Sequence, residues 1–479
     1  RSLDGATLVA ACGLALVAGI FVTLDGERRT GLYLAAISLG LGLASGPGFY
    51  SLVLILVLYG LGLALALRLL GRDWGWTALA AAYGELRGAD PVLLRRAAIT
   101  AGAVLGLAVT TFALHPAGIG HAADLLGAWA RGFLPGTGDQ PALYLLLVVA
   151  RYELLIVLPV LVMALLALRQ GLAGRADPAG PQPAAWSHTA FLAFWAAIAL
   201  LLALIAGQRT AGALLLVLVP LALLAGQGIE RSWRWIRERV FWAEAWLVAG
   251  VSLGLAVFLY LQLAFAARSS TGATVSVAGM SLYATTTYLI LALVALVLFV
   301  ALGAAAWFWR GKELLTGGAW LAALAILGLI TIKAMWGPSF ARATDPRELL
   351  VQPEQATSPQ VRLLVSELEE LSWALEGDAH TLPVTVDAGT GPVVAWYLRP
   401  WPVTTVEALS SPPGTLAAVT LAQDEPAIGE AFAGQGFPLT SRWLPWGLGG
   451  QDLLRWLLFS EGAEPVVEEV VLWVAEGEN

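Results

Sequence analysis

Charged residues and cysteine are both scarce in this chain. Asp, Glu, Lys and Arg make up 13% of its 479 residues, whereas soluble globular proteins contain roughly 25%. The single cysteine, Cys12, has no second thiol in the chain with which to form a disulfide. One cysteine and four histidines also argue against a structural zinc site. The sequence therefore predicts no disulfide framework, no metal site and no cofactor.

Basic patches are also absent, because the bases lie mainly in short loops between apolar stretches, so no nucleic-acid partner is expected. What the chain has in excess is hydrophobic side chains, at 58% of residues, with a mean hydropathy of +0.76. One signal or anchor segment cannot raise the mean of the whole chain this far. Many stretches must each be long enough to cross a bilayer core of ~30 Å. The lipid bilayer is the first partner that the sequence predicts.

About ten apolar stretches are suited to spanning a membrane. They occupy residues 7–24, 31–46, 50–70, 97–114, 142–168, 188–206, 210–227, 241–266, 285–309 and 318–336. Gly40, Gly42 and Gly46 suit close packing between membrane helices, although compositional bias alone explains them equally well. The sequence predicts an all-α polytopic bundle over residues 1–336.

The arginines and lysines predict the orientation of this bundle. One set of alternate loops contains most of the bases, and the other set contains only Arg1, Arg131, Arg209 and Arg268. Because basic loops stay in the cytoplasm, the second set is expected on the outer side of the plasma membrane. Within the outward loop at 115–141, the stretch 122–133 is typical of an amphipathic helix at the interface, anchored by Trp129 and Phe133. An ordinary structured loop fits equally well.

The composition changes after Trp336. Strands that alternate with helices indicate a small α/β domain, which we expect at 337–479, outside the cytoplasm. Helical patterning covers 358–374, and helix-like pieces cover 425–433 and 451–459. Short apolar runs lie at 383–387, 403–408, 416–421 and 467–474.

Ionisable residues inside apolar runs are costly and suggest function. Arg151 and Glu153 lie within the run 142–168. They are two residues apart and so do not face each other on a helix. They either line a wet cavity or pair with another helix as a structural element.

Three residues near the predicted outer surface have both a functional and an ordinary interpretation. Arg209, in a tight turn between two spans, suits a lipid phosphate or simple snorkelling to the interface. Asp4 precedes the first span, where it either contacts substrate or caps a helix. His115 ends a span and has either a proton-transfer role or a polar interfacial role.

Several short motifs resemble, in their order and spacing, those of one family. This is the flippase-activity-associated family of prokaryotic membrane proteins, related to the protein O-mannosyltransferase and aminoarabinose-transferase group of GT-C glycosyltransferases. The chain differs from the family where Gln208-Arg209 replaces Glu-Lys and where His115 replaces Asn. The motifs are Arg1-Ser2-Leu3-Asp4; Thr110-Thr111-Phe112 to His115-Pro116-Ala117-Gly118; Gln140-Pro141, Tyr144 and Tyr152-Glu153; Trp195, Gly207-Gln208-Arg209, Pro220 and Ala225-Gly226; Glu348-Leu349-Leu350-Val351 with Gln355; and Trp396-Tyr397-Leu398-Arg399.

The resemblance implies a GT-C-type transferase that takes a sugar from a polyprenyl-phosphate-linked donor at the outer face. Arg209 would then hold the phosphate leaving group, and Glu153 would position the acceptor or organise the cavity. Asp4, His115 and Tyr152 complete the expected substrate-binding set.

The catalytic residue stays unassigned, because the GT-C pattern places its key acid in the first outward loop. That loop would lie upstream of Arg1, so we expect the chain to lack its N-terminus. The alternative is a non-catalytic accessory to lipid-linked sugar flipping, or a membrane scaffold, which would also use ionisable residues lining a cavity. The sequence identifies neither the sugar nor the acceptor.

Overall fold

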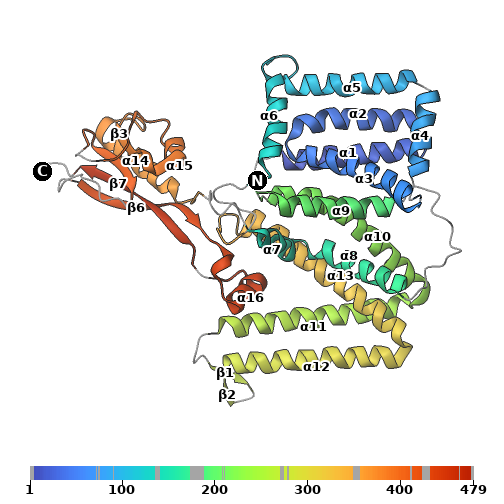
Figure 1. Ribbon diagram of the computed structural model, residues 1–479. Helices are drawn as coiled ribbons and strands as arrows, with labels where there is room; N and C mark the ends of the chain where they lie inside the picture. The colour runs from blue at the N-terminus through green and yellow to red at the C-terminus, as the bar shows by residue number, and fades with distance from the viewer. Residues whose placement is uncertain are drawn as a thin grey trace. The chain divides into compact units, whose positions relative to one another are not determined.

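The chain divides into two compact units, Arg1–Ile332 and Lys333–Asn479. The structure is a computed structural model (Figure 1). It describes residues 5–71, 73, 76–89, 91–134, 141–172, 188–207, 209, 211–269, 274–277, 280–348, 357–409, 413–422, 432–462 and 464–475.

Helices make up most of the first unit, with one short antiparallel hairpin of β1 and β2. The last helix, α13, continues into the second unit. The elements are α1 (Ala6–Leu24), α2 (Arg28–Ser45), α3 (Gly48–Leu70), α4 (Trp76–Ala89), α5 (Pro91–Val109), α6 (Gly118–Arg131), α7 (Ala142–Tyr152), α8 (Leu154–Leu172), α9 (His188–Ile205), η1 (Ala211–Leu214), α10 (Leu215–Arg239), α11 (Trp242–Arg268), β1 (Thr274–Val277), β2 (Met280–Tyr283), α12 (Ala284–Arg310) and α13 (Lys312–Trp336).

Among the described residues, eight helices are long and apolar enough to cross a membrane, which indicates a membrane protein. A ninth span is obtained if α7 and α8, which meet at a bend of 100°, are counted as one. The predicted stretch at 31–46 lies in α2, whose 18 residues include Arg28 and Arg29. These two arginines lower its hydropathy, so α2 is not among the eight, and the predicted count of about ten spans is not confirmed.

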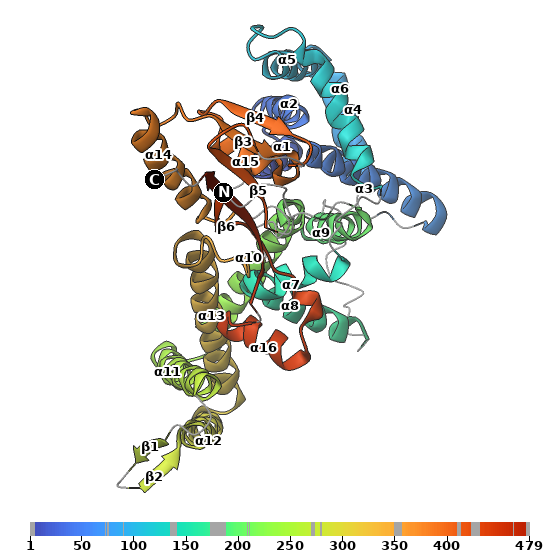
Figure 2. The same ribbon diagram turned by 90° about the vertical axis from the view of Figure 1, so that its left-hand side faces the viewer.

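Helices α1, α2 and α5 form a layer with α2 in the middle, and α4 and α6 lie across its opposite ends (Figures 1 and 2). Small residues allow this close approach. A Cβ at Gly19 would lie 2.6 Å from the Ala35 backbone nitrogen, and one at Gly40 would lie 2.6 Å from the Ala101 carbonyl oxygen. These contacts favour the close-packing interpretation of the glycines over compositional bias.

The remaining long helices expose large apolar side chains, as expected for contact with lipid. At the end of α12, Trp307, Phe308 and Trp309 are all exposed. At the junction of α10 and α11, Trp242 packs edge-to-face on Trp233 with ring centroids 4.7 Å apart. Aromatic side chains of this kind concentrate at membrane–water interfaces.

The second unit contains a five-stranded mixed sheet in the order β4-β3-β5-β7-β6. Strand β3 is parallel to both β4 and β5, whereas β7 is antiparallel to β5 and β6. The elements are η2 (Gly337–Ala341), α14 (Val361–Glu376), β3 (Val384–Asp387), η3 (Ala388–Thr390), α15 (Gly391–Tyr397), β4 (Val403–Val406), β5 (Ala417–Leu421), β6 (Phe432–Arg442), η4 (Pro445–Gly447), α16 (Gly450–Phe459) and β7 (Val466–Ala475).

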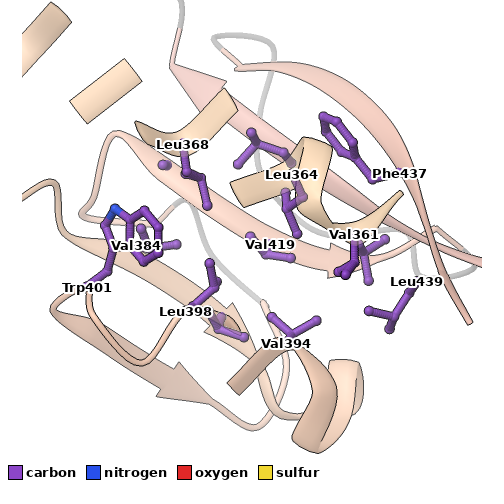
Figure 3. Close-up of a cluster of buried hydrophobic side chains, with 14 of the residues drawn as sticks. Val361, Leu364, Leu368, Val384, Val394, Leu398, Trp401, Val419, Phe437 and Leu439 are labelled. Atoms are coloured by element: carbon purple, nitrogen blue, oxygen red, sulfur yellow. The ribbon is translucent and has the colours of Figure 1, made fainter. Parts of the chain in front are cut away.

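One hydrophobic cluster holds this unit together (Figure 3). Leu364 and Leu368, one turn apart on α14, are fully buried with Val384 of β3 and Val419 of β5. Because side chains alternate along a strand, Thr385 points to the opposite face of the sheet from Val384. There its hydroxyl hydrogen-bonds that of Thr415 at 2.7 Å.

Most of the predicted elements of this unit are present, and one interpretation needs correction. The apolar runs at 383–387, 403–408, 416–421 and 467–474 correspond to β3, β4, β5 and β7. The helix-like piece at 425–433 lies largely outside the described residues, and its end belongs to strand β6.

Candidate functional site

A pocket of about 310 Å³ in the first unit is formed where several helices end. Its wall comes from the start of α1, the junction of α2 and α3, the end of α6, the end of α9, and η1 with the start of α10. More than half of the lining residues are glycine or alanine. Among the described residues, no charged side chain lines the pocket. The pocket is therefore suited to binding an apolar group.

Two aromatic rings form the bulkiest part of the lining. Trp129 and Phe133, one turn apart on α6 and its C-terminal extension, pack edge-to-face with centroids 5.4 Å apart. The Trp129 indole Nε1–H donates to Ser51 Oγ at 2.9 Å. That bond ties α6 to the start of α3 and fixes the indole in one orientation.

Small residues keep the pocket open. Gly5 approaches α2 so closely that an added Cβ would lie 2.2 Å from the Ser45 carbonyl oxygen. Ala10 on α1 and Ala206, just after the end of α9, line the pocket, where larger side chains would occupy its volume. The pocket therefore depends on residues that composition alone does not distinguish from ordinary membrane-helix packing.

The predicted phosphate-binding cation lies in the loop that joins two parts of the wall. Arg209 stands between Ala206 and Gly212, both of which line the pocket. Its Nη2 donates to the Leu204 carbonyl oxygen at 3.1 Å, near the end of α9. The same loop is held to α6, because the Gly207 N–H donates to the Gly132 carbonyl oxygen at 3.0 Å.

This bond places a cation at the C-terminal end of a helix, where the helix dipole favours positive charge. Arg209 itself does not line the pocket. Because a guanidinium carries five N–H donors, a bond to Leu204 is compatible with binding an anion.

The pocket lies at the end of the helices that is away from the arginine clusters. Helices α1 and α3 begin there, whereas Arg28 and Arg29 follow the other end of α1 and Arg68 lies in the last turn of α3. Helix α10 also begins at the pocket and ends with Arg237 and Arg239. The geometry thus matches the alternation of basic loops in the sequence.

Tyr152 and Glu153 occupy the break between α7 and α8. The run at 142–168, predicted to be one span, is instead two helices at 100°. The Glu153 carbonyl oxygen accepts from the Ile156 and Val157 N–H groups, so this residue immediately precedes α8 and accepts its first hydrogen bonds. Tyr152 is buried, with the Arg151 guanidinium 5.6 Å from its ring centroid, and Glu153 is half-buried.

His115 lies in a strained turn between α5 and α6. Thr111, Phe112 and Ala113 all have positive φ angles, of 51°, 57° and 67°. Backbone of this kind is costly for residues other than glycine. The turn is closed by the His115 N–H, which donates to the Thr110 carbonyl oxygen at 2.9 Å, and the His115 side chain is exposed.

The structure does not assemble the predicted substrate-binding set around this pocket. His115, Tyr152, Glu153 and Arg209 do not line it, and Arg209 comes nearest along the chain. Asp4 lies outside the described residues, although its neighbour Gly5 is in the lining. The roles of these five residues stay predictions.

Sequence reasoning missed the pocket itself. It comes from five segments that are far apart in the chain, so residue spacing contains no sign of it. The only signal was the prediction of Trp129 and Phe133 as interfacial anchors on an amphipathic helix, which α6 provides.

Within the part of the chain that the structure describes, no group of three or more His, Cys, Asp and Glu residues is placed to hold a metal ion. No family model, curated protein or solved structure matches this chain.

Proposed function

We propose that the chain is a membrane transferase of the GT-C type that binds a polyprenyl-phosphate-linked sugar at the apolar pocket. The observation that carries the proposal is a largely apolar cavity at one end of the helices, with a guanidinium in the loop between two parts of its wall. A polyprenyl phosphate has the matching chemistry, since an apolar chain joins an anionic headgroup.

The size of the pocket determines which part of such a lipid it can hold. At about 310 Å³ it is at the lower end of the ~300–1,000 Å³ typical of ligand sites. It would hold the isoprenoid units nearest the headgroup, while the rest of the tail stays in the bilayer. The phosphate would then lie at the level of Arg209, whose planar fork suits phosphate oxygens. A fixed cation there stabilises charge that develops on a phosphate leaving group.

The proposed topology places the pocket on the outer face of the plasma membrane. Adding α2 and the α7–α8 pair to the eight long apolar helices gives about ten spans. With the arginine clusters in the cytoplasm, the start of α1, helix α6 and the second unit lie outside. Helix α6 crosses the ends of the neighbouring helices (Figure 2), which suits a helix in the membrane surface.

One observation favours the second candidate function, a non-catalytic accessory that only binds the lipid. Among the described residues, neither a carboxylate nor an imidazole lines the pocket. A general base must come within hydrogen-bond reach of the proton that it removes. On this alternative the protein presents or transfers the lipid without chemistry.

Binding is tested by filling the pocket. Purified full chain in nanodiscs is titrated with polyprenyl phosphate and with uncharged polyprenol. We expect Ala10→Phe to abolish binding of the phosphate, because Ala10 lines the pocket, and Ala11→Phe to leave it unchanged, because Ala11 is exposed on the same helix. Equal binding by both variants would refute the site.

A second assay, which follows consumption of a polyprenyl-phosphate-linked sugar, then distinguishes the transferase from the non-catalytic accessory. A transferase releases polyprenyl phosphate from the donor in the presence of membrane acceptors, and Ala10→Phe loses this release. Binding without release would favour the accessory function.

A further inference from the structure

Helix α16 of the second unit has two different faces. Trp456 is fully buried, and its indole N–H donates to the Arg347 carbonyl oxygen at 3.1 Å. Its ring packs on Trp443 with centroids 5.1 Å apart. Leu454 and Leu458 are exposed at 60% and 50%. Each is two residues from Trp456, and two residues on a helix correspond to ~200°, so the leucines point away from the core of the unit.

This apolar face is held next to the last turn of α13, which belongs to the same unit. Lys333, in the last turn of α13, donates from Nζ to the Leu458 carbonyl oxygen at 3.1 Å. The bond joins the C-terminal end of α16 to α13 and places a cation where the α16 dipole favours one. The two leucines are therefore fixed at the level along α13 where Lys333 lies.

If α13 spans the bilayer, its length puts that level at the membrane surface. The helical segment from Lys312 to Ala341 has 30 residues, about 45 Å at 1.5 Å per residue, which exceeds a hydrocarbon core of ~30 Å. In a bilayer its final part would therefore lie among the headgroups. There Trp336 and Phe340 are exposed and packed together at 4.5 Å, as in the aromatic belts of membrane proteins.

We propose that α16 lies on the bilayer surface, with Leu454 and Leu458 inserted at the boundary between headgroups and acyl chains. Arg455, half-exposed beside this face, has its Nε 3.6 Å from Glu461 Oε2, and its long side chain can extend from there towards the headgroups. The second unit is then attached to the membrane at two elements, α13 and α16, and not at α13 alone. This inference does not depend on the proposed function.

The full chain allows a direct test because its only cysteine, Cys12, can be replaced by alanine. Single cysteines at Leu454, Leu458 and Leu363 are spin-labelled in proteoliposomes of phosphatidylcholine and phosphatidylglycerol. Leu363, on α14 of the same unit, is the matched control, since it is a leucine with 56% exposure. All three side chains are exposed, so the substitutions leave the core intact.

We expect labels at 454 and 458 to be reached by oxygen dissolved in lipid and shielded from a water-soluble nickel chelate. The label at 363 is expected to show the reverse. Collision rates with the nickel chelate at 454 and 458 that equal the rate at 363 would overturn the proposal.

Discussion

At the scale of single residues, the observed contact of Arg209 with the end of α9 has to be separated from its proposed role in phosphate binding. Its bond to the Leu204 carbonyl oxygen contributes ~0.3–1 kcal/mol as a cation at a helix end. A hydrogen bond to a charged phosphate contributes more, ~1.5–3 kcal/mol. We therefore predict that Arg209→Ala weakens polyprenyl phosphate binding about tenfold or more, with only a small loss of thermal stability.

Calorimetric titration of the purified protein measures this effect. Arg209→Lys, which keeps the charge, is expected to restore part of the affinity. Arg268→Ala is the control, because Arg268 lies exposed at the end of α11, away from the pocket lining. Unchanged affinity in Arg209→Ala would remove this arginine from the site.

Replacing Glu153 distinguishes a functional role of this residue from a structural one. A carboxylate within an apolar segment costs at least ~2.5 kcal/mol on insertion scales, and here it stands at the helix break. Because glutamine keeps the shape and removes only the charge, we predict that Glu153→Gln stays folded and loses ligand binding or transfer. A lower unfolding temperature with normal binding would instead assign Glu153 a structural role.

The residues that sequence reasoning selected were mainly charged or polar ones in unusual places, and it did not find the apolar wall of the pocket. His115 shows the limit well. The motif placed it at the end of a span, but three consecutive left-handed residues turn the chain there. None of these three is glycine, so composition gave no sign of the turn.

At the scale of elements, hydropathy located the long helices because a bilayer requires about 20 apolar residues in a row. It could not reveal the 100° bend in the run at 142–168, since no glycine or proline marks the break. Arg151 and Glu153 were the only local sign of it.

Strand β6 was missed for a different reason. Its sequence, FAGQGFPLTSR, contains two glycines and a proline and is typical of a loop. It forms a strand because all ten residues of β7 pair with it. Tertiary pairing of this kind overrides local propensity.

The packing of α2 against α5 leads to a prediction at the same scale. A Cβ at Gly40 would lie 2.6 Å from the Ala101 backbone oxygen, and that backbone cannot easily move. We predict that Gly40→Ala destabilises the first unit by ~1–3 kcal/mol, measured by denaturation in mixed micelles. Gly60→Ala, with no neighbouring atom within 4 Å of the added Cβ, is expected to be neutral or stabilising by up to ~1 kcal/mol. Equal effects of the two variants would contradict close α2–α5 packing.

At the scale of the whole molecule, the topology predicts where the second unit lies. We expect the arginine clusters at the ends of α3 and α10 to lie in the cytoplasm, and the proposed even number of spans would then place the second unit on the side of the N-terminus. Protease added to sealed right-side-out vesicles is expected to release a fragment from the region after α13. Release only from inverted vesicles would reverse the orientation.

The central claim is that the apolar pocket binds the lipid of a polyprenyl-phosphate-linked sugar. The most direct measurement uses a polyprenyl phosphate with a photoreactive group in the isoprenoid unit nearest the headgroup. After irradiation of the full chain in nanodiscs, the labelled peptides are mapped by mass spectrometry. The account predicts labelling at α6 around Trp129 and Phe133 and at the end of α9 near Leu202, abolished by excess unlabelled polyprenyl phosphate. Labelling confined to lipid-exposed helices such as α12, and unaffected by that competitor, would contradict it.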